Sequence, residues 1–397
     1  MRYLYAPDCA KGPDGRYYLY YSLDFSGVIS VAVSDVPAGP FSFLGYVSYE
    51  DGSLPEVGRM FDPAVLSEEG GNYLYYGSCP KERFVLLEGL ELPGAMMVKL
   101  ADDMHTILSD PVCVANGCDT AAGTGYEEHP FFEASSIRHM GGHYYFVYSS
   151  LQGHELCYGM ADTPAGPFTY KGVLISNGDI GYKGNVLPDC YYGNNHGGLV
   201  EIGDRTAIFW HRQTHGTSFS RQGCADFVEI LPDGTIPQVE MTSGGLSGIL
   251  PAAGAYSAGY ACNLWEEKRE CVGEVIMGME PGKMVMELPE KMIFITEDEK
   301  EDGTIDSYVH NLQKGACAGF KYFSFTGTES ELSVRLRGQG ELAFTVDDPD
   351  GEPVAVFSGE ASDWSWSREK IQVEKGVHAI YFRGAGGKLD FAEFSIG

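Results

Sequence analysis

Short runs of alternating apolar and polar residues, separated by turns that contain glycine, fill most of the chain. Tyr, Phe, Val and Leu dominate these runs, and no long segment keeps the 3.6-residue period of a helix. Because successive side chains of a strand point to opposite faces, this pattern predicts strands with one buried face. The sequence therefore predicts an all-β protein.

An internal repeat organises the first part of the chain. Four similar segments begin at Ala6, Phe61, Glu133 and Asn195. In each, a strand opens on a polar residue, a turn with glycine follows, and a second strand has alternating aromatic residues, which predicts a hairpin. Propeller blades usually repeat every 40–50 residues or so. The intervals here are longer, and we attribute the excess to long loops.

A second repeat supports the first. VSDVPAGPFSFLGYV and MADTPAGPFTYKGVL share a PAGPF turn and suit the outer hairpin of a blade. In a propeller, the innermost strand of every blade runs along the central channel, so polar residues that begin these strands converge.

The converging residues are expected to be Asp8, Asp62, Glu133 and His196, around one pocket. A single carboxylate at such a place could instead form a turn or bind water in the channel. Asp62 and Glu133 occupy equivalent places in consecutive hairpins, which favours a catalytic role for both.

The repeat stops near residue 250, and short alternating strands return after a charged, irregular stretch. We therefore expect a β-propeller domain over 1–250, a connector over 251–292, and a smaller β-sandwich over 293–397.

Four aromatic residues of the predicted sandwich could stack on sugar rings. The sequence DWSW should place Trp364 and Trp366 on one face of a strand, and Tyr381 and Phe382 are further candidates. Packing into the core is the alternative for at least one tryptophan.

The charge balance restricts the partners. Lys and Arg total 27 against 56 Asp and Glu, a formal net charge of −29, so nucleic acid and anionic membranes would be repelled. A neutral substrate fits better. The chain contains no apolar run long enough for a membrane span and no export signal at its start, which predicts a cytoplasmic protein as written. Secretion is not excluded if the N-terminus is truncated.

Several ordered blocks resemble glycoside hydrolase family 43, in the branch of α-L-arabinofuranosidases and β-xylosidases. These blocks are APD with GRYYLYY, FDPAVL, FEASSIR with HYYFVYSS, NNHGGLVEI with FWHR, and FSRQGCADFVEILPDGTIPQVEMTS. The resemblance covers about residues 3–262. The segment from GACAGFKYFSF onward resembles a carbohydrate-binding module of family 6.

The resemblance implies a five-bladed propeller that inverts the anomeric centre with three acidic residues. Glu133 matches the general acid, and Asp62 matches the Asp that orients the acid and raises its pKa. In the family the general base belongs to the first blade, which has no counterpart in this chain, so four blades are visible and the form given is expected to be inactive. Inversion requires the acid and the base to stand about 6.5–9.5 Å apart, with water between them.

Further residues are expected at the pocket. Asp8, His154 and Asn195 are expected to contact the substrate. The resemblance implies a sugar contact for Arg221 and a hydrated calcium ion that His196 helps to hold. A core position is the alternative for His196, and a salt bridge that closes the last blade is the alternative for Arg221.

The sequence thus predicts an inverting hydrolase of arabinofuranosyl or xylosyl linkages in oligosaccharides derived from plant polysaccharides. Its partner would be a neutral oligosaccharide or polysaccharide, and its cofactor calcium, without an organic cofactor. The alternative is a catalytically inert, truncated propeller whose carbohydrate-binding module alone is functional.

Overall fold

The computed structural model describes residues 3–23, 26–81, 89–190, 193, 195–266, 278–280, 283–285, 292–299 and 303–397. Strands dominate these residues, and the helical segments among them are three short 3-10 turns, η2 (Tyr182–Gly184), η3 (Gly245–Ser247) and η4 (Ala258–Tyr260). The predicted all-β class is confirmed. In the described part of the chain, no helix has the length and apolar character needed to cross a membrane.

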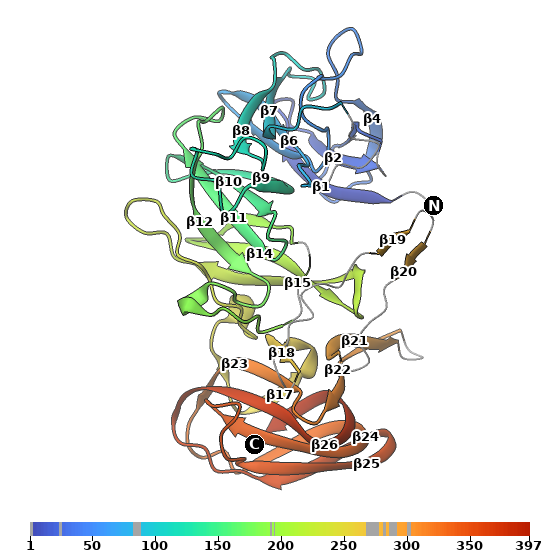
Figure 1. Ribbon diagram of the computed structural model, residues 1–397, viewed down its shortest axis with the longest axis vertical. Coiled ribbons are helices and arrows are strands. Elements are labelled where there is room, and N and C mark those ends of the chain that lie inside the picture. Colours follow the sequence, from blue (N-terminus) through green and yellow to red (C-terminus); the bar gives the residue numbers. More distant parts are fainter. Residues whose placement is uncertain are drawn as a thin grey trace. The chain divides into compact units, whose positions relative to one another are not determined.

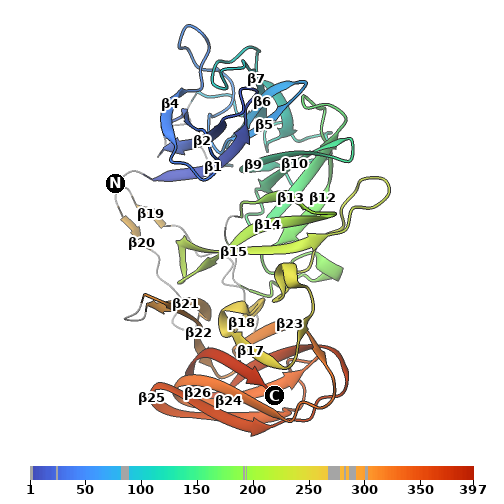
Figure 2. The same cartoon turned by 180° about the vertical axis from the view of Figure 1, so that it is seen from behind.

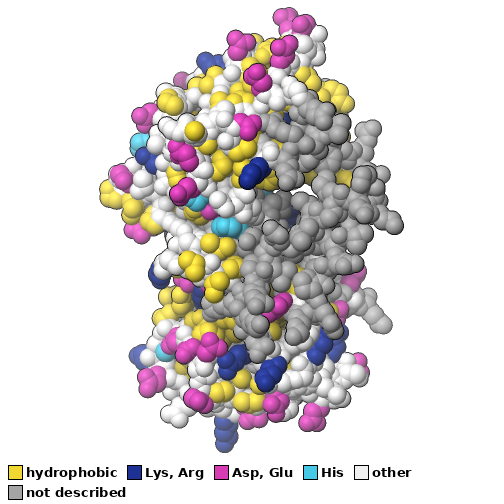
Figure 3. Space-filling view, in the orientation of Figure 1, with side chains coloured by type: hydrophobic (Ala, Val, Ile, Leu, Met, Phe, Trp, Pro, Cys, Tyr) yellow, Lys and Arg dark blue, Asp and Glu magenta, His cyan; other side chains and the backbone are white. Residues whose placement is uncertain are grey.

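The chain forms two compact units, which are described separately. The first consists of Met1–Ile175, Asn194–Trp210 and Val228–Gln238, and the second consists of Ser176–Gly193, His211–Phe227 and Val239–Gly397. Acidic side chains are scattered over the described part of the face in Figure 3, as the net charge requires.

Four consecutive sheets follow the four predicted hairpins (Figure 1). The first contains β1 (Leu4–Lys11), β2 (Tyr17–Leu23), β3 (Ile29–Ser34) and β4 (Ser42–Tyr46). The second contains β5 (Ala64–Glu68), β6 (Gly71–Tyr76), β7 (Gly94–Leu100) and β8 (Val112–Asn116). The third contains β9 (Phe131–Met140), β10 (His143–Ser150), β11 (Glu155–Ala161) and β12 (Thr169–Ser176). The fourth contains β13 (Gly198–Ile202), β14 (Arg205–Thr214) and β15 (Thr217–Val228).

Every one of these sheets is an antiparallel meander in chain order, the arrangement of a propeller blade. The first strands of successive sheets are neighbours, since β5 packs against both β1 and β9, and β9 packs against β13. Figure 2 shows β1, β5 and β9 from behind. The first strands of neighbouring sheets therefore lie side by side.

The alternating aromatic residues of the hairpins form the core between the sheets. Tyr75 of β6 packs against Phe146 of β10, with ring centroids 5.8 Å apart, and both side chains are fully buried. The hydroxyl of Tyr75 donates to the carbonyl of Pro164 at 2.7 Å, so its polar end is satisfied. Each such ring contributes about 1.5–3 kcal/mol of burial free energy, which fixes the strand register.

The two PAGPF turns have the same backbone geometry. Gly39 and Gly166 have φ values of 77° and 78°, and a Cβ at either position would lie 3.0 or 2.8 Å from the backbone nitrogen of the following phenylalanine. Only glycine fits both conditions. The turns connect β3 to β4 and β11 to β12, which are the outer hairpins of their sheets, as predicted.

The second unit contains a nine-stranded sheet with the path β16-β23-β26-β22-β21. Its strands are β16 (Leu250–Pro251), β17 (Gly254–Ser257), β18 (Asn263–Trp265), β21 (Phe294–Glu299), β22 (Ile305–Gln313), β23 (Cys317–Phe325), β24 (Glu331–Val346), β25 (Ala355–Lys370) and β26 (Gly376–Ile396). The short strands β19 (Gly278–Glu280) and β20 (Lys283–Val285) pair with each other.

The boundaries expected at residues 250 and 292 differ from those of the sheet. β17, β18 and the second residue of β16 lie in the expected connector, and all three strands pair with β23 or β26. Their short length and many small residues concealed them in the sequence. The prediction that Tyr381 and Phe382 could stack on sugar rings was wrong. These residues are 8% and 0% exposed and pack in the core of this sheet.

Candidate active site

Asp62 links the second and third sheets at their first strands. It lies two residues before β5 and is 4% exposed, and its Oδ2 accepts a hydrogen bond from the backbone N–H of Ala134 at 3.0 Å. Asp62 and Ala134 both have positive φ, 46° and 67°. Such conformations are costly for residues other than glycine and gather at functional sites.

Glu133 is the third residue of β9 and directly precedes Ala134. It is half-buried and lies opposite Ser149 of β10, next to an irregularity in the strand register. The two predicted catalytic carboxylates are thus linked through Ala134, which follows Glu133 and donates its N–H to Asp62.

Asp8 repeats this arrangement one sheet earlier. Its Oδ2 accepts a hydrogen bond from the N–H of Val65 in β5 at 2.8 Å. Burial raises the pKa of Asp8, although the charge of Arg138 and the hydrogen bonds from Val65 and Cys9 oppose the shift. Successive leading carboxylates therefore each bind the first strand of the next sheet.

Arg59 is a residue of this site that the sequence reasoning missed. It is 5% exposed, its guanidinium lies 4.6 Å from the centre of the Phe61 ring, and it interacts electrostatically with Glu133 and Asp62. Burial lowers the pKa of Arg59, and the two carboxylates raise it in part. An arginine is rarely buried without a charged partner, so its place just before FDPAVL in an apolar stretch was a usable signal.

The start of β13 is held close to β9. A Cβ at Gly198 would lie 2.3 Å from the Oγ of Ser136, and one at Gly197 would lie 1.9 Å from the carbonyl oxygen of Phe209. Gly197 is thus needed for the close approach to the backbone of Phe209, and Gly198 allows the close approach to the side chain of Ser136. Asn195, 1% exposed, and the half-buried His196 directly precede them.

Calcium binds six to eight oxygen ligands, and an imidazole is a poor substitute. Among the residues that the structure describes, one group of three His, Cys, Asp or Glu side chains lies within ligand reach, and His196 is not in it. A calcium ion at His196 would therefore depend on water for most of its ligands.

That group consists of His129, Glu155 and Cys157, whose ligand atoms lie within 4.8 Å of one another. His129 Nδ1 and Glu155 Oε1 are 2.6 Å apart. Two ligands of one tetrahedral ion at about 2.0 Å would be separated by about 3.3 Å. The group is therefore a hydrogen-bonded network rather than a preformed metal centre. His154 beside it is 8% exposed, and burial lowers its pKa, so it is neutral near pH 7.

The remaining predicted residues belong to the second unit. Arg221 in β15 contacts Nε2 of His211 with its Nη1 at 2.8 Å.

The two tryptophans differ in their surroundings. Trp364 in β25 packs against Arg337, whose guanidinium lies 4.4 Å from the ring centre, and against Tyr308 at 5.2 Å. Trp366 is 52% exposed. Of the two tryptophans, Trp366 has the freer ring for a ligand.

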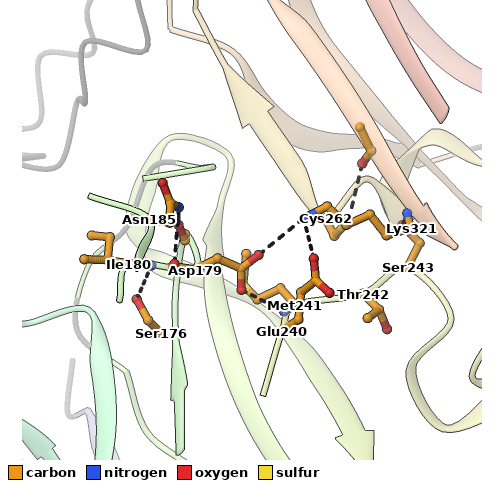
Figure 4. A network of polar contacts seen from close by, with 12 residues as sticks. Ser176, Asp179, Ile180, Asn185, Glu240, Met241, Thr242, Ser243, Cys262 and Lys321 are labelled. Carbon is orange, nitrogen blue, oxygen red and sulfur yellow. Dashed lines mark hydrogen bonds and ion pairs between the residues drawn. The ribbon is translucent and has the colours of Figure 1, made fainter. Parts of the chain in front are cut away.

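A buried charge network lies in the same unit (Figure 4). The Nζ of Lys321 is 3.0 Å from Glu240 Oε1 and 3.6 Å from Asp179 Oδ2. Tyr322 donates to Glu240 at 3.0 Å, and Asp179 accepts from the N–H of Met241 at 2.8 Å. Burial alone would lower the pKa of Lys321, but Cys262 and the two carboxylates raise it well above its usual range. The network joins β23 to segments that are distant in the sequence.

In the first unit, a backbone N–H holds Asp62 at the strand that carries Glu133. In general, a carboxylate beside a carboxylic acid disfavours ionisation of that acid, and a protonated acid can give its proton to a leaving group. Arg59 balances part of the charge of the pair.

Comparison with known proteins shows the family of the chain. The sequence profile of "Glycosyl hydrolases family 43" matches residues 1–236. The chain is 44% identical to a "Xylosidase/arabinosidase" of Thermoclostridium stercorarium, over 96% of this chain and 80% of that protein. It is 35% identical to a "Xylosidase/arabinosidase" of Bacteroides ovatus, over 41% of this chain and 54% of that protein.

Among solved structures, a family 43 arabinoxylan arabinofuranohydrolase from Bacillus subtilis in complex with cellotetraose is similar at a TM-score of 0.49. The two sequences are 20% identical, and the match covers 99% of this chain and 79% of that protein.

Proposed function

The chain belongs to glycosyl hydrolases family 43, and we propose from this membership that it hydrolyses xylosyl or arabinofuranosyl linkages in oligosaccharides derived from plant polysaccharides. The observation that carries the proposal is the 44% identity with a xylosidase/arabinosidase over 96% of the chain. The alternative of an inert binding protein is not favoured by this relationship.

In the proposed reaction, Glu133 gives its proton to the glycosidic oxygen as the bond to the anomeric carbon breaks. Asp62 keeps Glu133 protonated by its negative charge and holds the backbone at Ala134, to which it is hydrogen-bonded at 3.0 Å. A water molecule attacks from the opposite side of the sugar, so that the anomeric configuration is inverted.

We place the general base that activates this water on the first blade of the family's propeller, outside the four sheets described above, as the resemblance implies. Asp8, Asn195, His154 and Arg221 are proposed to contact the sugar. A calcium ion at His196 is proposed on the same basis, and no catalytic step is assigned to it. The strands over 293–397 are proposed to form a carbohydrate-binding sandwich similar to family 6.

A panel of 4-nitrophenyl pentosides and short xylo- and arabino-oligosaccharides tests the proposed function. We expect release of xylose or arabinose, and proton NMR during the first turnovers should show the inverted anomer. Release of the retained anomer, or hydrolysis of hexosides alone, would contradict the proposal.

The base requires a separate comparison. Activity and solution mass should be measured for the 397-residue chain and for a form extended upstream by one blade. We expect activity to depend on the extension. Equal activity in the short, monomeric form would place the base within these 397 residues, and Asp8 would be the first candidate.

A further inference from the structure

Glu155 at the start of β11 is the centre of a buried hydrogen-bond network in the third sheet. It is 3% exposed and accepts from His129 Nδ1 at 2.6 Å, from the Oγ of Ser150 and from the thiol of Cys157 at 3.3 Å. Burial alone would raise the pKa of Glu155, but the hydrogen bonds from His129 and Ser150 and the charge of His129 lower it. Glu155 is therefore an ionised acceptor.

The network holds the backbone segment that leads to Glu133. His129 precedes Phe131, the first residue of β9, by two positions, and Ser150 is the cross-strand partner of Phe131. Glu155 binds both His129 and Ser150, so it ties the chain entering β9 to the end of β10.

Further contacts fix the same short segment. The carbonyl of His129 accepts from the hydroxyl of Tyr148 at 2.7 Å, and that of Pro130 accepts from the N–H of Leu151 at 3.1 Å. The carbonyl of Phe132 accepts from the N–H of Cys79 at 2.7 Å. The imidazole of His129 also stacks on Tyr170, with ring centroids 5.2 Å apart and an interplanar angle of 11°. The hydrogen bonds named above end on backbone carbonyls. The bond from His129 to Glu155, in contrast, joins two ionisable side chains and can be removed by substitution.

We propose that His129 and Glu155 are positioning residues for the general acid, because their hydrogen bond fixes the start of β9 and thereby the place of Glu133. The inference rests on the proposed function of Glu133. Neither residue exchanges a proton with the substrate. Misplacement of a catalytic group by about 1 Å can cost about 10²-fold in rate, so a fixed backbone matters for proton transfer.

His129→Ala and His129→Asn test the proposal in the full chain, or in its upstream-extended form if activity requires it. Alanine removes the donor, whereas the asparagine amide nitrogen can take the place of Nδ1 and donate to Glu155. The substrates should be aryl xylosides whose leaving groups range from 4-nitrophenol to phenol. Poor leaving groups need the acid, and good ones depend on it little.

A matched control lies at the other end of the same strand. His139 Nδ1 is 2.8 Å from Oε2 of Glu68, and its ring stacks on Tyr144 with centroids 4.0 Å apart. His139 is six positions from Glu133, about 20 Å along an extended strand. His139→Ala thus removes a similar His–Glu pair without touching the start of β9.

We expect His129→Ala to lower kcat on phenyl xyloside by about 10–100-fold and on 4-nitrophenyl xyloside by less than about threefold. His129→Asn should restore most of the loss, and His139→Ala should leave the ratio of the two rates unchanged. Equal losses on both substrates in His129→Ala would overturn the proposal, since a merely structural role lowers both rates alike. Glu133→Gln is the reference variant. If Glu133→Gln leaves the ratio of the two rates unchanged, Glu133 is not the general acid, and the proposed function fails independently of His129. Glu155→Gln, which keeps an acceptor oxygen, should resemble His129→Ala in direction with a smaller loss.

Discussion

Asp62 accepts a hydrogen bond from the backbone N–H of Ala134, the residue that follows Glu133, at 3.0 Å. One carboxylate is thereby fixed beside another across two sheets. In the proposed reaction, this bond would let Asp62 orient the strand of the acid and act on the proton of the acid at the same time.

Asp62→Asn separates these two effects, because the amide oxygen can still accept from Ala134 but carries no charge. Without the repelling neighbour, Glu133 should lose its proton at lower pH. We expect the basic limb of the pH–rate profile to move to lower pH. If the limb stays in place while the variant remains active, Asp62 has a structural role only.

Glu133→Gln removes the proton donor and keeps the size of the side chain. Turnover on substrates with poor leaving groups should fall by about 10²–10⁴, the usual contribution of general acid catalysis. Steady-state kinetics on a natural oligosaccharide would check this, with circular dichroism to verify folding. An unchanged rate would exclude Glu133 as the acid.

Lys321→Met leaves Glu240 and Asp179 in a buried place without their cation. Breaking a buried ion pair from one side usually costs about 3–5 kcal/mol, and we expect a loss of this size in the free energy of unfolding. Arg383→Met is the control, since its partner Asp350 is 84% exposed and the pair should contribute less than about 1 kcal/mol. Urea denaturation of both variants measures the difference, and similar losses would contradict a special role for Lys321.

Asp179 should make stability depend on pH. Burial raises the pKa of Asp179 from 3.8 to about 7, against the charge of Lys321 and the hydrogen bond from Met241, which lower it. Between about pH 4 and pH 7 the folded protein keeps a proton that the unfolded chain has released, so stability falls as the pH rises through this window.

Asp179→Asn cannot ionise, so the stability of this variant relative to the parent protein should increase from pH 5 to pH 7 and level off above. Denaturation midpoints at several pH values would show this trend. A difference that is constant with pH would mean that Asp179 is ionised throughout.

Trp366 and Trp364 should respond differently to substitution. Trp366 is 52% exposed, so Trp366→Ala should weaken binding of soluble xylan or arabinoxylan while leaving stability nearly unchanged. Trp364→Ala should mainly lower stability, because it removes a ring that packs against both Arg337 and Tyr308. Affinity electrophoresis and thermal unfolding would distinguish the two effects. Equal binding by both variants and the parent protein would place the carbohydrate site elsewhere.

Much of the fold could be predicted because its signals are local. The alternation of aromatic residues and the glycines of the turns specify hairpins within about twenty residues, and the repeat of those hairpins predicts blades. Asp62 and Glu133 were found in the same way, as equivalent positions in two repeats. The short strands β16 to β18 escaped because strands of two to four residues carry little periodicity.

By itself, then, the sequence determined the all-β class, the four hairpins and the two candidate catalytic carboxylates. Only the tertiary structure decided which buried charges are partners, because a charge is tolerated in the interior only where another segment meets it. Glu155 and His129 are 26 residues apart, and Lys321 and Glu240 are 81 residues apart. No local pattern encodes such pairs, since they arise when separate strands pack and exclude water from between them.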